Sequence, residues 1–83
     1  MRVLYFAWVR EAVGLDEEVV APPPEVATVA ALIDWLAGRS EGHARAFADR
    51  SRLRAAVDQA FVPLEARVAG AEEVAIFPPV TGG

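Results

Sequence analysis

The apolar residues of this chain are grouped in short runs that proline, glycine and charged residues separate. The run from Val3 to Val9 is continuous and apolar, which is typical of a central β-strand. Gly14 then marks a turn, and the stretch from Glu17 to Ala21 predicts a second strand. Three consecutive prolines, Pro22 to Pro24, end that strand because proline cannot continue a hydrogen-bonded ladder.

The middle of the chain contains one clear helical pattern. Thr28 is suited to cap a helix, and four apolar residues after it recur at the i, i+3, i+4 and i+7 spacing of an amphipathic helix: Val29, Leu32, Ile33 and Leu36. Gly38 is expected to end this helix. Residues 39–52 are polar apart from Phe47, so we expect a loop there with at most one weak helical turn.

The last third of the chain predicts three further strands. Leu53 to Val57 and Phe61 to Leu64 would be joined by a tight turn at residues 58–60, and Gly70 would make another turn. Val74 to Phe77 predicts the last strand. Because strands joined through a helix tend to run parallel, we expect this last strand to lie beside the first one.

This order of elements predicts a single α+β domain spanning residues 1–83. It would consist of a mixed sheet of four to five strands, with one main helix packed on one face, which is the outline of a β-grasp fold. Residues 78–83 would form an extended C-terminal tail, because Pro78 and Pro79 cannot donate to a ladder.

Alternation along the first strand leaves surplus apolar side chains on one face. Leu4, Phe6 and Trp8 would share the face that is bracketed by Arg2 and Arg10, and one helix can cover only the opposite face. Two interpretations remain open for these residues, together with Phe61 and Phe77. They form either a docking patch for another protein, with Arg10 as a rim charge, or a second small core under residues 39–52.

Composition excludes several classes of function. The net charge of −4 argues against a nucleic-acid partner. The chain has no cysteine and no lysine, which excludes disulfides, metal–thiolate sites, a nucleophilic thiol and Schiff-base chemistry. No apolar run approaches the roughly 20 residues of a membrane-spanning helix, so we expect a cytoplasmic protein without a membrane partner.

Few side chains offer chemistry. His43 lies in the polar segment, and we expect an ordinary surface residue there. The acidic stretches Asp16 to Glu18 and Glu72–Glu73 are adjacent residues, which point to opposite faces of a strand and indicate solvated edges. We therefore expect no metal site and no cofactor bound by this chain. The candidate reactive group that remains is the terminal carboxylate of Gly83.

The closing sequence FPPVTGG is suited to present such a carboxylate. Pro78 and Pro79 stiffen the stem, Val80 offers one apolar anchor, and Gly82 and Gly83 remove every side chain from the tip. Fully extended, the six residues from Pro78 would reach about 20 Å, enough to thread a carboxylate into a narrow pocket. Joining that carboxylate to AMP would activate it, and a sulfur donor could then convert it to a nucleophilic thiocarboxylate.

Three segments together resemble a known family: YFAWVREAVG near the start, AAVDQAFV in the middle and EEVAIFPPVTGG at the end. They are similar to the MoaD-type small subunits of molybdopterin synthase, sulfur carriers related to ubiquitin and to the thiamine sulfur carrier. The resemblance implies a ubiquitin-like β-grasp fold. It also implies that Gly83 is adenylated by a ubiquitin-activating-type adenylyltransferase, which consumes ATP, and is then thiocarboxylated with sulfur from a donor protein.

The same resemblance implies a heterotetramer with the large synthase subunit, whose active site would receive the tail and pass its sulfur to cyclic pyranopterin monophosphate. The inserted residues would be Pro78, Pro79, Val80, Thr81, Gly82 and Gly83, and partner contacts would lie at Phe6, Arg10, Phe61 and Phe77. Other uses of the same tail stay open, namely sulfur delivery for thiamine, tRNA thiolation or cysteine, and conjugation to proteins. A β-grasp binding module without carrier chemistry is a further alternative.

Overall fold

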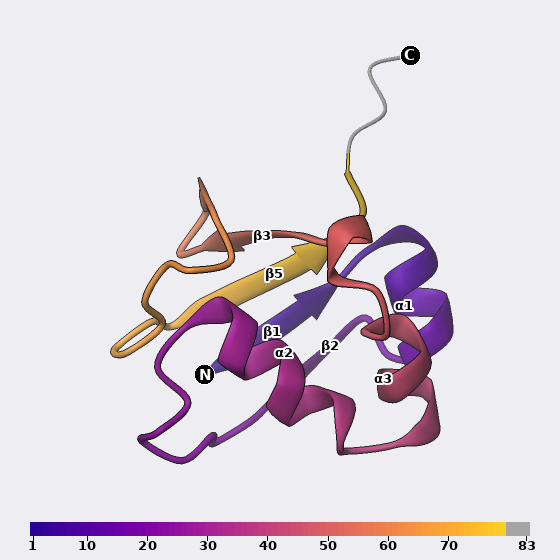
Figure 1. Cartoon of the computed structure of the whole chain (residues 1–83), viewed down its shortest axis with the longest axis horizontal. Helices are drawn as coiled ribbons and strands as arrows, with labels where there is room; N and C mark the ends of the chain where they lie inside the picture. Colours follow the sequence, from indigo (N-terminus) through magenta and orange to yellow (C-terminus); the bar gives the residue numbers. More distant parts are fainter. Residues whose placement is uncertain (80–83) are drawn as a thin grey trace.

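Five strands form one mixed sheet in the part of the chain that the structure, a computed structural model, describes, residues 1–79 (Figure 1). The elements follow in the order β1 (Arg2–Tyr5), α1 (Ala7–Val13), β2 (Glu17–Val19), α2 (Val29–Ala37), α3 (Glu41–Ala46), the 3-10 helix η1 (Arg50–Arg52), β3 (Arg54–Val57), β4 (Ala60–Val62) and β5 (Glu73–Phe77). The order of strands across the sheet is β2-β1-β5-β3-β4.

The first and last strands lie side by side in the interior of this sheet. β5 pairs in parallel with β1 on one side and antiparallel with β3 on the other, while β2 and β4 form the edges. The predicted neighbourhood of the first and last strands is therefore confirmed, as is the predicted mixed β-grasp sheet. Figure 1 shows β1 and β5 as adjacent arrows that point in the same direction.

The strand predicted from Val3 to Val9 is wrong in its second half. β1 ends at Tyr5, and Phe6 is still extended, with φ −131° and ψ 156°. Ala7 then adopts a positive φ of 53° and begins α1. A short apolar run suits a strand and a buried helix equally well, and here the helix forms.

The reason for α1 lies in the residues after Val9. The side chains that pack on or against the core recur at helical spacing, at Val9, Ala12 and Val13. Gly14 ends the helix with a left-handed φ of 88°, and its N–H donates to the carbonyl oxygen of Arg10 at 2.8 Å. The turn predicted at Gly14 is confirmed, but it follows a helix.

The helix predicted after Thr28 is confirmed as α2. The Thr28 Oγ1 accepts a hydrogen bond from the backbone N–H of Ala31 at 3.1 Å, and Gly38 is the C-cap. The four apolar residues of the predicted stripe are all fully buried: Val29, Leu32, Ile33 and Leu36. They pack in one core with inward-facing residues of the strands, among them Val3, Val74 and Ile76.

Residues 39–52 are more ordered than the predicted loop, because they form α3 and η1. The Ser40 Oγ caps α3 by accepting from the backbone N–H of His43, and Asp49 caps η1 in the same way. α3 and its C-cap contribute three buried side chains: His43, Ala46 and the C-cap Phe47. A six-residue helix is too short for its periodicity to stand out in a polar sequence.

The tight turn predicted between the third and fourth strands is confirmed. Asp58 and Gln59 both have positive φ, 48° and 72°, which is the pattern of a two-residue type I′ hairpin. The turn at Gly70 is also confirmed, with φ 77°. The strand predicted over Phe61 to Leu64 ends one residue before Pro63, since proline lacks the N–H that would continue the ladder.

The helices are short and pack on the core. Among the described residues, no helix combines the length and hydrophobicity that crossing a bilayer requires.

We expect the crossing of α3 over α1 to be intolerant of any side chain at Gly42. A Cβ added there would lie 2.4 Å from the carbonyl oxygen of Ala12, and a backbone atom cannot swing aside. Gly42→Ala should therefore lower the free energy of unfolding by about 1–3 kcal/mol. The matched control is Gly38→Ala, whose Cβ would make an ordinary 3.6 Å contact. Urea unfolding curves measure both variants, and equal stability would contradict a tight crossing.

Candidate functional site

The face of the sheet that points away from the helices carries a row of apolar side chains in register. Leu4 pairs with Ala75, Ala75 with Ala56, and Ala56 with Phe61, so the row crosses four strands. The residues immediately before Leu4, Ala75 and Ala56 belong to the buried core. Since successive side chains on a strand alternate between faces, the row lies on the outer face of the sheet.

A groove of about 480 Å³ lies over this row, and we term it the alanine groove. Ala56 and Ala75 form its floor, because their short side chains leave space between larger neighbours. Leu4 and Phe6 line it on the β1 side, and Phe61 and Phe77 line it towards β4 and the end of β5. The alanine groove is therefore an apolar depression between aromatic walls.

Phe61 is the most exposed large apolar residue of this face, at 83%. Its ring lies against that of Phe77, with the two centroids 5.7 Å apart. Phe6 is 45% exposed on the other side of the alanine groove. Contiguous exposed apolar area of this kind usually marks a protein interface.

The structure thus brings together three of the four residues predicted as partner contacts: Phe6, Phe61 and Phe77. Arg10 lies one helical turn beyond Phe6 on α1, with its Nε 3.8 Å from a carboxylate oxygen of Asp16. It does not line the alanine groove, and its role in partner contact stays a prediction.

Trp8 does not belong to this face, contrary to the predicted alternation. Because α1 replaces the second half of the strand, Trp8 packs against the core, and the guanidinium of Arg52 stacks on its ring at 4.6 Å. Trp8, one of the surplus apolar residues, therefore contacts the segment 39–52. The predicted second core beneath that segment is wrong for Leu4 and Phe6, which line the alanine groove.

The predicted tail begins at the alanine groove. Pro78, which directly follows β5, lines the groove beside Phe77. β5 is hydrogen-bonded on both sides, so the base of the tail is held by two neighbouring strands. The predicted tail residues Val80, Thr81, Gly82 and Gly83 lie outside the described residues.

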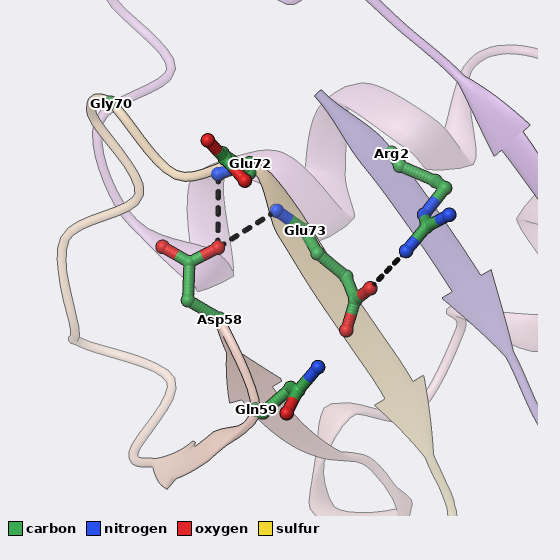
Figure 2. Close-up of a pocket in the computed structure, with 6 residues that line it drawn as sticks. All are labelled: Arg2, Asp58, Gln59, Gly70, Glu72 and Glu73. Atoms are coloured by element: carbon green, nitrogen blue, oxygen red, sulfur yellow. Dashed lines mark hydrogen bonds and ion pairs between the residues drawn. The ribbon is translucent and has the colours of Figure 1, made fainter.

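A polar pocket of about 670 Å³ lies at the opposite end of β5 (Figure 2). One Asp58 carboxylate oxygen accepts hydrogen bonds from the backbone N–H groups of Glu72 and Glu73, both at 3.0 Å. The guanidinium of Arg2 pairs with the carboxylate of Glu73. These bonds tie the β3–β4 turn and β1 to the start of β5. Within residues 1–79, no group of three or more His, Cys, Asp or Glu side chains is arranged to hold a metal ion.

His43 is not the surface residue that the sequence predicts, because it is only 5% exposed. Its Nε2 lies 2.6 Å from a carboxylate oxygen of Glu18, and its Nδ1 lies 2.7 Å from the Ser40 hydroxyl. The same Glu18 oxygen accepts a hydrogen bond from the Tyr5 hydroxyl at 2.7 Å. The prediction of a solvated acidic edge is therefore wrong for Glu18. This buried network joins α3 to β1 and β2 on the helix side of the sheet, away from the alanine groove.

The network shifts the pKa values of Glu18 and Tyr5. Burial alone would raise the pKa of the Glu18 carboxyl, but hydrogen bonds from His43 and Tyr5 and the charge of Arg39 outweigh burial and hold that pKa below its usual value. Burial and the bond to Glu18 raise the pKa of Tyr5, so its hydroxyl stays a donor. The arrangement is a satisfied structural network rather than a reactive site.

Known proteins are similar to this chain in sequence and in fold. A family model described as the ThiS family matches residues 3–83. The molybdopterin synthase sulfur carrier subunit of Escherichia coli strain K12 is 45% identical over 83 residues, which cover all of this chain and 99% of that protein. The subunit of the same name from Haemophilus influenzae is 37% identical with the same coverage. SAMP1 from Haloferax volcanii, a crystal structure, matches with a TM-score of 0.73 and 27% identity, covering all of this chain and 98% of that one.

We expect Glu18→Gln to remove a stability term that depends on pH. Because the pKa of Glu18 is lowered in the folded protein, its contribution is fully present above the pKa of an unfolded glutamate, about 4.3. The contribution is lost as the pH falls through the lower folded value. At pH 7 the substitution should cost about 1.5–3 kcal/mol, the range for a hydrogen bond to a charged group.

Thermal unfolding between pH 2 and pH 7 measures this effect. The control is Glu17→Gln on the same strand, whose side chain is 51% exposed and should matter little. The interpretation would be wrong if both variants lost the same stability, or if the loss in Glu18→Gln were as large at pH 2 as at pH 7.

Proposed function

This chain belongs to the ThiS family, and we propose that it is the sulfur carrier subunit of a molybdopterin synthase. The observation that supports this role best is the position of Pro78, which lines the exposed alanine groove as the chain leaves β5. A partner seated on that groove would meet the chain where it continues towards Gly83. Docking and delivery would then use one continuous surface.

In this proposal the C-terminal carboxylate of Gly83 is the reacting group. On a ubiquitin-activating-type adenylyltransferase, a carboxylate oxygen attacks the α-phosphorus of ATP and releases pyrophosphate. The terminal sulfur of a persulfide on a donor protein then attacks the carbonyl carbon and displaces AMP. A thiol cleaves the acyl disulfide that forms, which leaves the thiocarboxylate on this chain and a disulfide on the donor. The thiocarboxylate sulfur finally bonds to cyclic pyranopterin monophosphate in the active site of the large synthase subunit. Water then cleaves the C–S bond to Gly83, which leaves the sulfur on the pterin and restores the Gly83 carboxylate.

The large subunit supplies the pterin pocket and its catalytic side chains. In this chain, the buried polar groups around Glu18 and the capping carboxylate of Asp58 are engaged in structural bonds. The chain contributes contacts at Phe6, Arg10, Phe61 and Phe77, and it inserts residues 78–83. The working assembly is a cytoplasmic heterotetramer with two copies of each subunit.

Mass spectrometry of the intact protein tests the carrier chemistry. Incubation with ATP, the adenylyltransferase and a sulfur donor should replace one oxygen atom of Gly83 by sulfur. A variant with one alanine added after Gly83 should keep its melting temperature but gain no sulfur. Its terminal carboxylate belongs to the added alanine and no longer to a glycine without a side chain.

An unmodified wild-type protein under conditions that load a known carrier would contradict the proposal. Loading followed by transfer to a different acceptor, with no molybdopterin formed on adding the large subunit and cyclic pyranopterin monophosphate, would instead place the chain in another sulfur pathway.

We expect Phe61→Ala to weaken binding of the large subunit about tenfold or more, since exposed aromatic anchors dominate interface energies. Phe61 is exposed in the free chain, so the melting temperature should hardly change. Val19→Ala is the control, because Val19 is 79% exposed and pairs with Arg2 at the far edge of the outer face, where it does not line the alanine groove. Titration calorimetry compares the three proteins. Equal affinities for wild type and Phe61→Ala would exclude the outer face as the docking surface.

A further inference from the structure

Arg54 stands at the end of the outer face where the tail begins. It is the first residue of β3 and the register partner of Phe77, the last residue of β5. A second hollow, of about 260 Å³, lies beside it and is lined by Arg54, Ala55, Phe61, Val62 and Phe77. We term this the Arg54 hollow. Phe61 and Phe77 line both hollows, so their paired rings stand between the alanine groove and the Arg54 hollow.

The guanidinium of Arg54 is held in place by backbone carbonyl groups. Its Nη1 donates to the carbonyl oxygens of Leu53, at 2.8 Å, and Ser51, at 3.4 Å. Within residues 1–79, the ion pairs of the structure do not include Arg54. Arg2, at the other end of the same face, is paired with the carboxylates of Glu73 and Glu17.

The donors of Arg54 that remain have a specific geometry. Guanidinium nitrogens Nε and Nη2 form a planar fork that matches the two oxygens of a carboxylate. Since Nη1 already bonds to backbone carbonyls, this fork is oriented before any ligand arrives. A pre-oriented arginine that has no ion pair within residues 1–79, next to an apolar groove, favours a ligand that is apolar at one point and anionic at the next.

We propose that the outer face is a two-point socket for the large subunit. One apolar side chain of that subunit occupies the alanine groove, and a neighbouring carboxylate of the same surface pairs with Arg54 across the two phenylalanine rings. This proposal rests on the proposed function and adds to it the chemistry of the partner surface. It assigns Ala56 and Ala75 as the residues that set the size of the apolar side chain.

Two points of attachment fix an orientation that an apolar contact alone leaves free. An apolar groove gives affinity but little directional preference, whereas a charged pair at one end specifies the register of the two surfaces. Because Arg54 pairs in register with Phe77, the charged pair fixes the partner next to the start of the tail. The chain carries a net charge of −4, so a cation at this position favours an anionic group on the partner surface.

Titration calorimetry with the purified large subunit tests the carboxylate contact. Arg54→Gln should weaken binding about tenfold and reduce its dependence on sodium chloride, because one screened ion pair is lost. Arg54→Lys, which keeps the charge but loses the fork, should fall between that variant and wild type. Arg45→Gln on α3 is the control, an exposed arginine away from the sheet, and should bind within about twofold of wild type.

The groove contact is tested by filling the floor. Ala56→Leu and Ala75→Val add methyl groups that point outwards, so both should weaken binding about tenfold. The melting temperature of each alanine variant shows whether it is folded, and its affinity is interpreted only when it is. The Arg54 variants change an exposed residue, so their result does not depend on the folding of the alanine variants.

Each part of the proposal has its own contradicting outcome. Arg54→Gln with wild-type affinity and salt dependence would overturn the carboxylate contact. Folded Ala56→Leu or Ala75→Val bound as tightly as wild type would overturn the groove contact. A wild-type chain that does not bind the large subunit would overturn the proposed function, and this inference with it.

Discussion

The helices of this protein pack against one face of its sheet, and alternation along the strands sends every second side chain to the other face. In a chain of 83 residues, one core uses most of the apolar side chains that can be buried. The outer face nevertheless keeps Leu4, Phe6, Phe61 and Phe77, which a monomer gains nothing by exposing. Their position is best understood as surface reserved for another protein.

The same sheet holds the start of the C-terminal segment. β5 is paired on both sides, and the network of Tyr5, Glu18 and His43 fastens α3 to β1 and β2 behind it. Buried, hydrogen-bonded polar side chains thus make the helix side rigid. Apolar side chains remain exposed on the outer face. A domain built in this way holds the start of the C-terminal segment on a rigid sheet, as the proposed delivery of sulfur requires.

Some of this could be predicted from the sequence because the signals were local. The N-cap at Thr28, the stripe of four buried residues in α2 and the turn residues around Asp58 all depend on near neighbours. The parallel pairing of β1 and β5 followed from the helical crossover between them. The three aromatic residues of the outer face were also found, since their bulk stands out in strands.

Other features depend on distant residues and could not be read locally. The burial of His43 depends on Glu18, 25 positions away, and the apolar run before Arg10 suits either a strand or a helix. An alanine in a sequence does not indicate which face of a strand it occupies. Ala56 and Ala75 could therefore be assigned to the floor of a groove only from the register of the strands. Nothing in the sequence distinguished Arg54 from the other seven arginines. Its pairing with Phe77 places it at the end of β5, where the C-terminal segment starts.

Hydroxyl-radical footprinting of the complex with the large subunit tests the docking face most directly, because it reports every exposed aromatic side chain in one experiment. The account predicts that Phe61, Phe77 and Phe6 lose reactivity on binding, while Trp35 on α2 reacts as it does in the free chain. Protection of Trp35, with Phe61 as reactive in the complex as before, would show that the partner binds the helices and would contradict the account.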